Sequence, residues 1–315
     1  MPITKRVGGT PKPSARPSGL ASNAKANTKP TMQKKPGLSL PTEPVPPEED
    51  LESYTLALYG APKIGKTSFV AEFNDPFFLM FEPGGKGLTI KRVQINGWAE
   101  TKDNRAVLVK GVLYCSMEYA VDLIIQTDDI KTVVIDTADL AYESCTQSVV
   151  SKAGEDSINE GSLGYGKGVD KVDAEFKKQV LRLTSTGRGV VFISHATEKE
   201  FQEVTGATYQ KILPSMKDRT RRFINGFADI IAYYGYFGAD RYLVIQGNDK
   251  LDAGHRIPGH FQTPKGLPVH AIPMGQMPSE GFANYLLAYA NEQTSQTVLT
   301  RKADLGERKI PFKKK

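Results

Sequence analysis

Cysteine and tryptophan are nearly missing from this 315-residue chain, which has two cysteines, Cys115 and Cys145, and one tryptophan, Trp98. Two cysteines are too few for a zinc cluster or a disulfide framework, so neither kind of site is indicated. No apolar run approaches the roughly 18 residues of a membrane span, and the N-terminal segment lacks the apolar core of a secretory signal. These absences predict a protein of the reducing cytoplasm with no membrane partner.

Aromatic residues are absent from the first fifty positions, which are rich in Pro, Lys, Ser, Thr, Asn and Gly. Such a segment cannot bury enough apolar area to offset its ordering entropy, so we expect residues 1–50 to be a disordered tail and linker. Residues 1–47 hold eight Lys/Arg against one acid, and residues 301–315 hold seven against two. We therefore predict basic tails at 1–50 and 293–315 around a folded domain at 51–292. Either the N-terminal tail only aids solubility, or it contacts nucleic-acid phosphates without sequence preference.

One stretch carries a specific signature, because residues 60–67 fit the phosphate-loop pattern G-x-x-x-x-G-K-[ST] between a strand-like and a helix-like run. Gly60 and Gly65 let backbone N–H groups face a phosphate oxygen. Lys66 can place its ammonium between the β- and γ-phosphates of ATP, and the Thr67 hydroxyl can ligate Mg²⁺. The predicted site for ATP and Mg²⁺ comprises Gly60, Ala61, Pro62, Lys63, Ile64, Gly65, Lys66, Thr67 and Ser68.

Two apolar runs further along the chain end in a carboxylate. Residues 77–81 predict a strand covered on both faces, central in an α/β sheet, and Glu82 follows it. Residues 132–135 are mostly β-branched and lead into Asp136, the form of a Walker B strand. Glu82 could polarise an attacking water, and Asp136 could hold Mg²⁺ opposite Thr67. The plainer alternatives are a solvated loop acid for Glu82 and a helix N-cap for Asp136.

A third strand, at residues 189–195, is expected to end at His195. That end lies at the carboxyl edge, where α/β sheets place their ligands. His195 could sense the γ-phosphate or the attacking water, or it could be a satisfied edge histidine.

The remaining segments are assigned by pattern. Residues 151–170 predict a mobile, Gly-rich surface loop, and residues 197–213 and 229–246 predict β-hairpins. Helices are expected at 117–127, 172–184 and 281–291. Ser116 would cap the first of these helices, whose buried face we expect to hold Tyr119, Ala120, Leu123 and Ile124.

Six cations follow the third strand and are candidates for contacts with DNA phosphates. The alternative is that these cations only form a solvated surface, as clustered charged residues usually do. They are Lys199, Lys211, Lys217, Arg219, Arg221 and Arg222.

Together, residues 60–68, 77–82, 132–136 and 190–195 resemble the ATPase core of RecA-like recombinases, over residues 52–258. The Ser194-His195 ending is similar to that of phage nucleotide-binding proteins of this group, some of which are single-strand annealing proteins. The resemblance implies a mostly parallel sheet with the His195 strand between the phosphate-loop and Asp136 strands. It also implies that Glu82 is the general base, that residues 151–170 and the segment after His195 contact DNA, and that Lys250 and Arg256 reach the nucleotide of a neighbouring subunit.

The chain departs from the family at two points. RecA itself has Gln where His195 stands, and the segment before the core contains no Phe, so the Phe-based polymerisation motif of some relatives is missing. We therefore expect a homo-oligomer that shares its ATP sites, without predicting a filament.

The predicted function is ATP-dependent binding of single-stranded DNA in phage recombination or annealing, in the cytoplasm of the infected host. A single-strand-binding protein is a further candidate partner. Two alternatives stay open: a helicase-type motor or helicase loader, and a nucleotide-gated DNA clamp that hardly hydrolyses ATP.

Overall fold

The computed structural model describes residues 42–203 and 206–293. Of the tails predicted at 1–50 and 293–315, residues 1–41 and 294–315 lie outside the described residues, whereas Glu48 and Glu49 contact the folded domain through their carbonyls. Regular structure begins with a 3-10 turn, η1 (Leu51–Ser53), and ends with helix α6 (Pro278–Tyr289). Among the described residues, no helix has the length and apolar character needed to cross a membrane.

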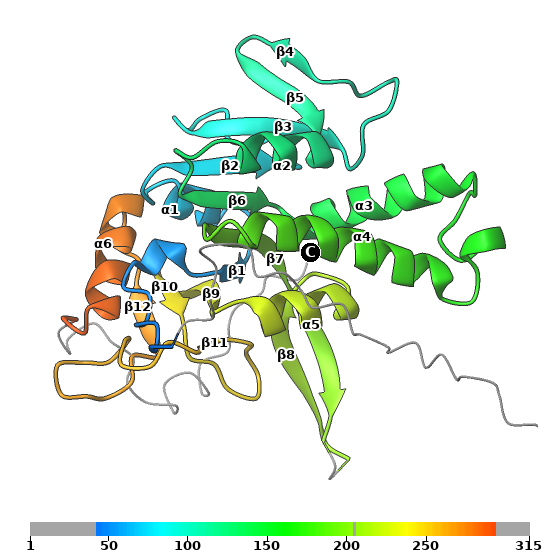
Figure 1. Ribbon diagram of the computed structural model, residues 1–315. Coiled ribbons are helices and arrows are strands. Elements are labelled where there is room, and N and C mark those ends of the chain that lie inside the picture. Colours follow the sequence, from blue (N-terminus) through cyan, green and yellow to red (C-terminus); the bar gives the residue numbers. More distant parts are fainter. Residues whose placement is uncertain (1–41, 204–205, 294–315) are drawn as a thin grey trace, which may run out of the picture. The chain divides into compact units, whose positions relative to one another are not determined.

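A mostly parallel sheet forms the middle layer of the fold (Figure 1). Its central strands are successive parallel neighbours: β1 (Leu56–Gly60), β7 (Gly189–Gln202), β6 (Thr132–Asp136), β2 (Pro76–Met80) and β3 (Lys91–Gly97). The predicted α/β class is therefore confirmed. The strand that carries His195 lies between the phosphate-loop strand and the Asp136 strand, as the RecA-like resemblance implied.

Further strands extend the sheet on both sides. Next to β3 lie β5 (Val112–Ser116) and then β4 (Val107–Val109). On the other side of β1 lie β9 (Ile230–Phe237), β10 (Asp240–Val244) and β12 (Ala271–Pro273), with the short β11 (Gly254–His255) also paired to β9. The β9–β10 pair confirms the hairpin predicted at 229–246.

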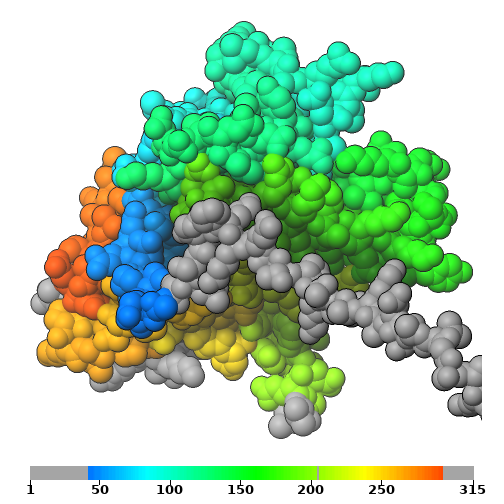
Figure 2. All heavy atoms as spheres, viewed as in Figure 1, coloured from blue at the N-terminus to red at the C-terminus, as the bar shows by residue number. Residues whose placement is uncertain are grey.

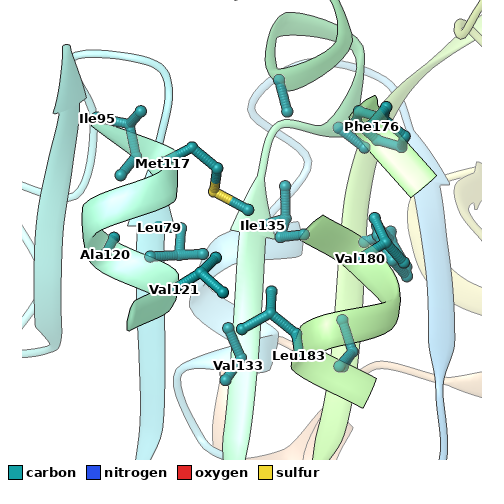
Figure 3. Packing of buried hydrophobic residues seen from close by; sticks show 14 of the residues in the cluster. Leu79, Ile95, Met117, Ala120, Val121, Val133, Ile135, Phe176, Val180 and Leu183 are labelled. Atoms are coloured by element: carbon teal, nitrogen blue, oxygen red, sulfur yellow. The ribbon is translucent and has the colours of Figure 1, made fainter. Parts of the chain in front are cut away.

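Helices cover both faces of the sheet, because successive side chains of a strand point to opposite faces. Leu56 and Leu58 of β1 belong to the cluster formed with α1 (Lys66–Val70) and α6. Ala57, between them, belongs to the opposite cluster, formed with α2 (Met117–Ile125), α3 (Ala138–Ala153), α4 (Lys167–Thr184) and α5 (Asp218–Phe227). In Figure 3, Leu79 faces Val121 of α2, and Val133 faces Leu183 of α4.

Helix α2 begins where the sequence predicts it, since the Ser116 hydroxyl accepts a hydrogen bond from the Tyr119 N–H at 3.2 Å. Its buried face is different from the expected one. Tyr119 and Leu123 are 37% and 38% exposed, whereas Met117, Ala120, Val121 and Ile124 are buried. Contacts with β3, β5 and α4 select this face, because they lie on the Val121 side of the helix.

The Gly-rich segment 151–170 holds more structure than a surface loop. Helix α3 extends to Ala153, a short 3-10 turn η2 spans Gly161–Leu163, and α4 already begins at Lys167. Leu163 is fully buried, and Ile158 packs against the core beneath α3 and α4. The loop prediction is wrong at both ends of the segment, which belong to helices, and at Leu163, which is buried in the core.

Strand β7 does not end at His195, contrary to the expectation. It continues to Gln202 because residues 196–202 pair antiparallel with β8 (Thr208–Pro214), which confirms the hairpin predicted at 197–213. The far end of this hairpin stands clear of the neighbouring surface in Figure 2. One continuous strand thus runs from the centre of the sheet into a projecting hairpin.

Candidate nucleotide site

The carboxyl ends of the central strands meet at one edge of the sheet, the edge where α/β proteins bind ligands. In the strand register, Gly60 of β1 lies opposite His195 of β7, and Met80 of β2 lies opposite Asp136 of β6. Glu82 follows β2 by two residues. The structure therefore brings together the phosphate loop, Glu82, Asp136 and His195, which lie far apart in the sequence.

The phosphate loop joins β1 directly to α1. Gly65 has a φ of +113°, in the region that favours glycine, and its carbonyl accepts the Phe69 N–H that starts the helix. The packing of the sheet also requires a glycine at position 60, because a Cβ there would lie 2.1 Å from the Tyr234 carbonyl oxygen of β9. The role of Gly60 toward phosphate stays a prediction.

Lys66 is folded over this loop. Its Nζ donates to the carbonyl oxygens of Gly60 at 3.0 Å and Ala61 at 2.9 Å, and the residue is only 6% exposed. Burial lowers the pKa of this ammonium, while the nearby carboxylates of Asp136, Asp139 and Glu82 act to raise it. Lys66 is thus a buried cation held by main-chain oxygens, which phosphate oxygens could replace.

Thr67 and Asp136 form the second part of the site. The Thr67 hydroxyl donates to Asp136 Oδ2 at 2.8 Å, and Asp136 is 5% exposed. Burial raises the pKa of Asp136, the Thr67 hydrogen bond opposes this rise, and the charge of Glu82 adds to it. Hydroxyl and carboxylate oxygens are the hard ligands that Mg²⁺ takes, so these two residues fit that ion.

A magnesium ion bound there would need ligands from outside the chain. Among the described residues, no group of three or more His, Cys, Asp or Glu side chains could hold a metal ion. Mg²⁺ usually binds one or two carboxylates and completes its shell with water and substrate phosphates. The pair fits a site that forms only with a bound nucleotide.

Glu82 and His195 face each other beside this pair. His195 Nε2 lies 3.9 Å from Glu82 Oε1, and the Thr137 hydroxyl donates to the same carboxylate oxygen at 3.4 Å. On its other side, His195 Nδ1 lies 3.0 Å from Asp139 Oδ2. The Asp139 hydrogen bond raises the pKa of His195, against the opposing effect of burial. The site thus combines two carboxylates and one imidazole at the edge of the phosphate loop.

Two residues at this site were missed from the sequence. Asp139 lies in the first turn of α3, where acids are common because the positive end of the helix dipole stabilises a carboxylate. An acid at this position therefore gave no specific indication of a functional site. Arg241 follows a hairpin turn outside any motif. Its Nη1 lies 3.4 Å from the position of a Cβ on Gly65, and its Nη2 donates to the Gly275 carbonyl at 2.9 Å. A guanidinium of the same chain therefore lies against the phosphate loop.

Lys250 and Arg256 are not joined to this site within the chain. Arg256 donates to the Asp229 carboxylate at 2.9 Å and to the carbonyls of Gly226 and Phe227, so it fastens the end of α5. Lys250 is exposed, and its ammonium forms no ion pair among the described residues.

The six cations predicted to contact DNA lie on the β7–β8 hairpin and around α5. Four are paired with acids: Lys211 with Asp252 at 2.6 Å, Arg219 with Asp170 at 2.5 Å, Arg221 with Asp218 at 3.1 Å, and Lys199 also with Asp218. Lys217 lies over the Tyr142 ring, and Arg222 Nε donates to the Asp218 carbonyl. Much of their charge is therefore compensated within the chain.

Two cavities lie in this region. One, of about 440 Å³, is lined by α3 residues from Asp139 to Gln147 and by residues 215–217. The other, of about 400 Å³, lies between the hairpin and α5, where Phe201 stands beside Lys211, Arg221 and Arg222. The second cavity thus combines an aromatic ring with three cations.

Comparisons with known proteins found a curated relative and a similar solved structure. The chain is similar to the SPbeta prophage-derived uncharacterized protein YorG of Bacillus subtilis (strain 168), with 24% identity over 191 residues. The match covers 60% of this chain and 53% of YorG, so the chain spans about half the length of that relative. Among solved structures, the KaiC-like protein PH0186 of Pyrococcus horikoshii OT3 matches 72% of this chain and 88% of its own, with 14% identity and a TM-score of 0.37.

A protein-family model described as an AAA domain matches residues 52–257. The match includes the phosphate loop, Glu82, Asp136 and His195, and it covers more than half of the chain. The chain belongs to the AAA domain family.

Proposed function

We propose that the chain is a magnesium-dependent ATPase whose triphosphate site is formed by Lys66, Thr67 and Asp136. The observation that carries this proposal is the 2.8 Å contact between Thr67 and Asp136 beside the buried Lys66 ammonium. Lys66 would exchange its two carbonyl partners for phosphate oxygens when ATP binds. Mg²⁺ held by Thr67 and Asp136 would neutralise charge on the β- and γ-phosphates.

Glu82 and His195 are proposed to act on the attacking water. Glu82 lies at the edge of the site with its carboxylate exposed enough to meet water, and it is a suitable general base. His195 would donate to the γ-phosphate or hold the water from the opposite side. Lys66 would then stabilise the charge that develops on the transferred phosphoryl group.

Single-stranded DNA is proposed as the macromolecular partner, bound between the β7–β8 hairpin and α5. The supporting feature is the cavity that places Phe201 beside Lys211, Arg221 and Arg222, because unpaired bases stack on aromatic rings while cations bind the phosphates. DNA phosphates would compete with Asp218 and Asp252 for these cations. The prophage origin given in the name of YorG supports a task in phage recombination or annealing.

Strand β7 offers a physical link between the two sites. His195 at the nucleotide site and Phe201 at the cavity lie on this one strand. A shift of the hairpin on DNA binding would therefore act directly on the position of His195. We propose that DNA stimulates hydrolysis by this route.

The test is release of phosphate from ATP and Mg²⁺, measured with and without single-stranded and double-stranded DNA. We expect hydrolysis that single strands stimulate, and DNA binding that weakens steeply with salt. Hydrolysis coupled to directional strand displacement would favour the helicase-type motor. DNA binding that responds to ATP without turnover would favour the clamp, and failure to bind ATP would reject all three functions.

A pair of variants distinguishes the role of the hairpin from that of the nucleotide site. The variant Phe201→Ala should lose DNA stimulation while keeping its DNA-independent hydrolysis, because Phe201 lies on the hairpin away from the phosphate loop. The matched variant Phe282→Ala changes an aromatic residue of α6 on the opposite face of the sheet. If DNA stimulated ATP hydrolysis equally in both variants and in the unmodified protein, the hairpin would not be part of the DNA site.

A further inference from the structure

We propose that Asp139 is a positioning residue that fixes the orientation of His195 and so presents Nε2 of its ring to Glu82. The proposal deepens the proposed function, because the space beside Glu82 and His195 matters for catalysis only if ATP is hydrolysed there. No family motif in the sequence singles out Asp139. Its position three residues after Asp136 places it on the first turn of the helix that leaves the site.

The geometry gives the two ring nitrogens different partners. Nδ1 lies 3.0 Å from Asp139 Oδ2, which is a hydrogen-bond distance. Nε2 lies 3.9 Å from Glu82 Oε1, which is too long for a hydrogen bond. Asp139 therefore holds the ring, and Nε2 stays available to a phosphate or a water molecule.

His195 is the hydrogen-bond partner of the Asp139 carboxylate, and the Lys66 ammonium also interacts with that carboxylate through its charge. The other carboxylate oxygen, Oδ1, is buried and has no hydrogen-bond partner among the described residues. Burying a carboxylate is costly unless it is paired. Glu143, one turn further along α3, is exposed and forms no ion pair among the described residues, so it provides a matched control on the same helix.

The hydrogen bond also fixes where the proton lies. When one imidazole nitrogen donates to a carboxylate, the neutral ring carries its proton there and leaves a lone pair on the other nitrogen. In the imidazolium form, Nε2 becomes a donor in the same direction. Asp139 and Glu82 raise the pKa of His195, whereas burial and Lys66 lower it. In both forms the ring faces Glu82 through the same atom.

The first test needs no nucleotide. The ¹⁵N shifts of imidazole nitrogens distinguish the two neutral forms, and the chain has only four histidines, so the signal lost in His195→Gln identifies His195. In Asp139→Asn we expect mixed neutral forms of His195 and a lower pKa, and in Glu143→Gln a spectrum like that of the unmodified protein. His195 signals that are unchanged in Asp139→Asn would overturn the proposal.

The second test is kinetic. Asp139→Asn should lower kcat about 10- to 100-fold, by analogy with the loss of the partner that orients a metal-binding histidine, with ATP affinity unchanged. In a His195→Gln background the same change should have little effect, because Asp139 acts through His195. A loss of equal size in both backgrounds would assign Asp139 to helix stability and overturn the proposal.

The two tests also separate this proposal from the proposed function. If the unmodified protein binds ATP without hydrolysing it, the proposed ATPase function fails. The ¹⁵N comparison would still confirm or overturn the orienting role, since it is made on the nucleotide-free protein.

Discussion

Lys66 shows how one residue can be costly to the fold and necessary to the site. A buried ammonium loses hydration, which lowers its pKa, and two main-chain carbonyls replace only part of what water supplied. A triphosphate would supply the missing negative charge. The free energy that the fold gives up at this residue is therefore recovered when a nucleotide binds.

Replacing Lys66 by Ala should weaken ATP binding without weakening the fold. Charge-assisted hydrogen bonds contribute about 1.5–3 kcal/mol, which corresponds to about 10- to 100-fold in affinity. Removing a buried charge should leave the thermal unfolding temperature unchanged or higher. Calorimetric titration with ATP and Mg²⁺, together with thermal unfolding, measures both. Wild-type affinity in this variant would contradict the assignment of the phosphate loop.

Glu82 should separate binding from turnover. The variant Glu82→Gln keeps the size and polarity of the side chain and loses its basicity, so we expect normal ATP affinity and hydrolysis slower by about 10²–10⁴-fold. Single-turnover hydrolysis of bound ATP is the decisive measurement. A wild-type rate would return Glu82 to the role of a solvated loop acid.

The elements of the sheet show what patterns of sequence can and cannot predict. The strand ending at Asp136 and the strand before Glu82 were predicted to within about one residue of their bounds, because continuous apolar runs mark strands buried on both faces. The prediction ended strand β7 at His195, whereas the strand continues to Gln202. Its second half has the alternating pattern of a hairpin strand and was therefore assigned to a separate element. The strand order followed from family resemblance rather than from any pattern in the residues.

The candidate site was predicted unevenly for a related reason. Lys66, Thr67 and Asp136 belong to motifs whose spacing is set by the phosphate chemistry, and the structure brings them together. Asp139 and Arg241 reach the site through the helix after β6 and the hairpin after β9. Their places depend on strand order and side-chain direction, which single-sequence patterns do not encode.

Helix α4 offers a test of the packing that supports the site. Phe176 is buried, stacks on Trp98 with ring centroids 5.5 Å apart and meets Tyr142 of α3 edge-on. Phe176→Ala should lower the free energy of unfolding by about 3–5 kcal/mol, measured by urea denaturation. The control Leu181→Ala, on the exposed side of the same helix, should cost far less. Similar losses for both variants would contradict the assigned buried face.

At the scale of the whole molecule, we propose that a second subunit completes the site around the γ-phosphate. Lys66 and a bound Mg²⁺ would cover only part of the developing charge, and Lys250 has no ion-pair partner among the described residues. In NTPases, cations supplied by a second molecule contribute about 10³–10⁵ in rate. We therefore expect an oligomer in which Lys250 of one subunit meets the nucleotide of the next.

Mixing two inactive variants tests this arrangement. Lys250→Ala subunits keep an intact phosphate loop, and Lys66→Ala subunits keep an intact Lys250, so mixed oligomers should regain part of the DNA-stimulated hydrolysis. Lys178→Ala, which removes an exposed lysine of α4, is the matched control and should stay active. Full activity of Lys250→Ala alone, or no recovery on mixing, would leave Lys250 as a surface charge.

The Tyr289 hydroxyl, at the end of α6, donates to the Glu48 carbonyl at 3.4 Å and to the Glu49 carbonyl at 3.2 Å. The segment that leads into the sheet and the helix that closes the fold are therefore neighbours in space. A short Gly/Ser linker between residues 293 and 47 could join them, while new termini are opened at the exposed turn of Lys110 and Gly111 between β4 and β5. Such a circular permutant should keep the order of the central strands, and with it the nucleotide site, although the order of the sequence would have changed.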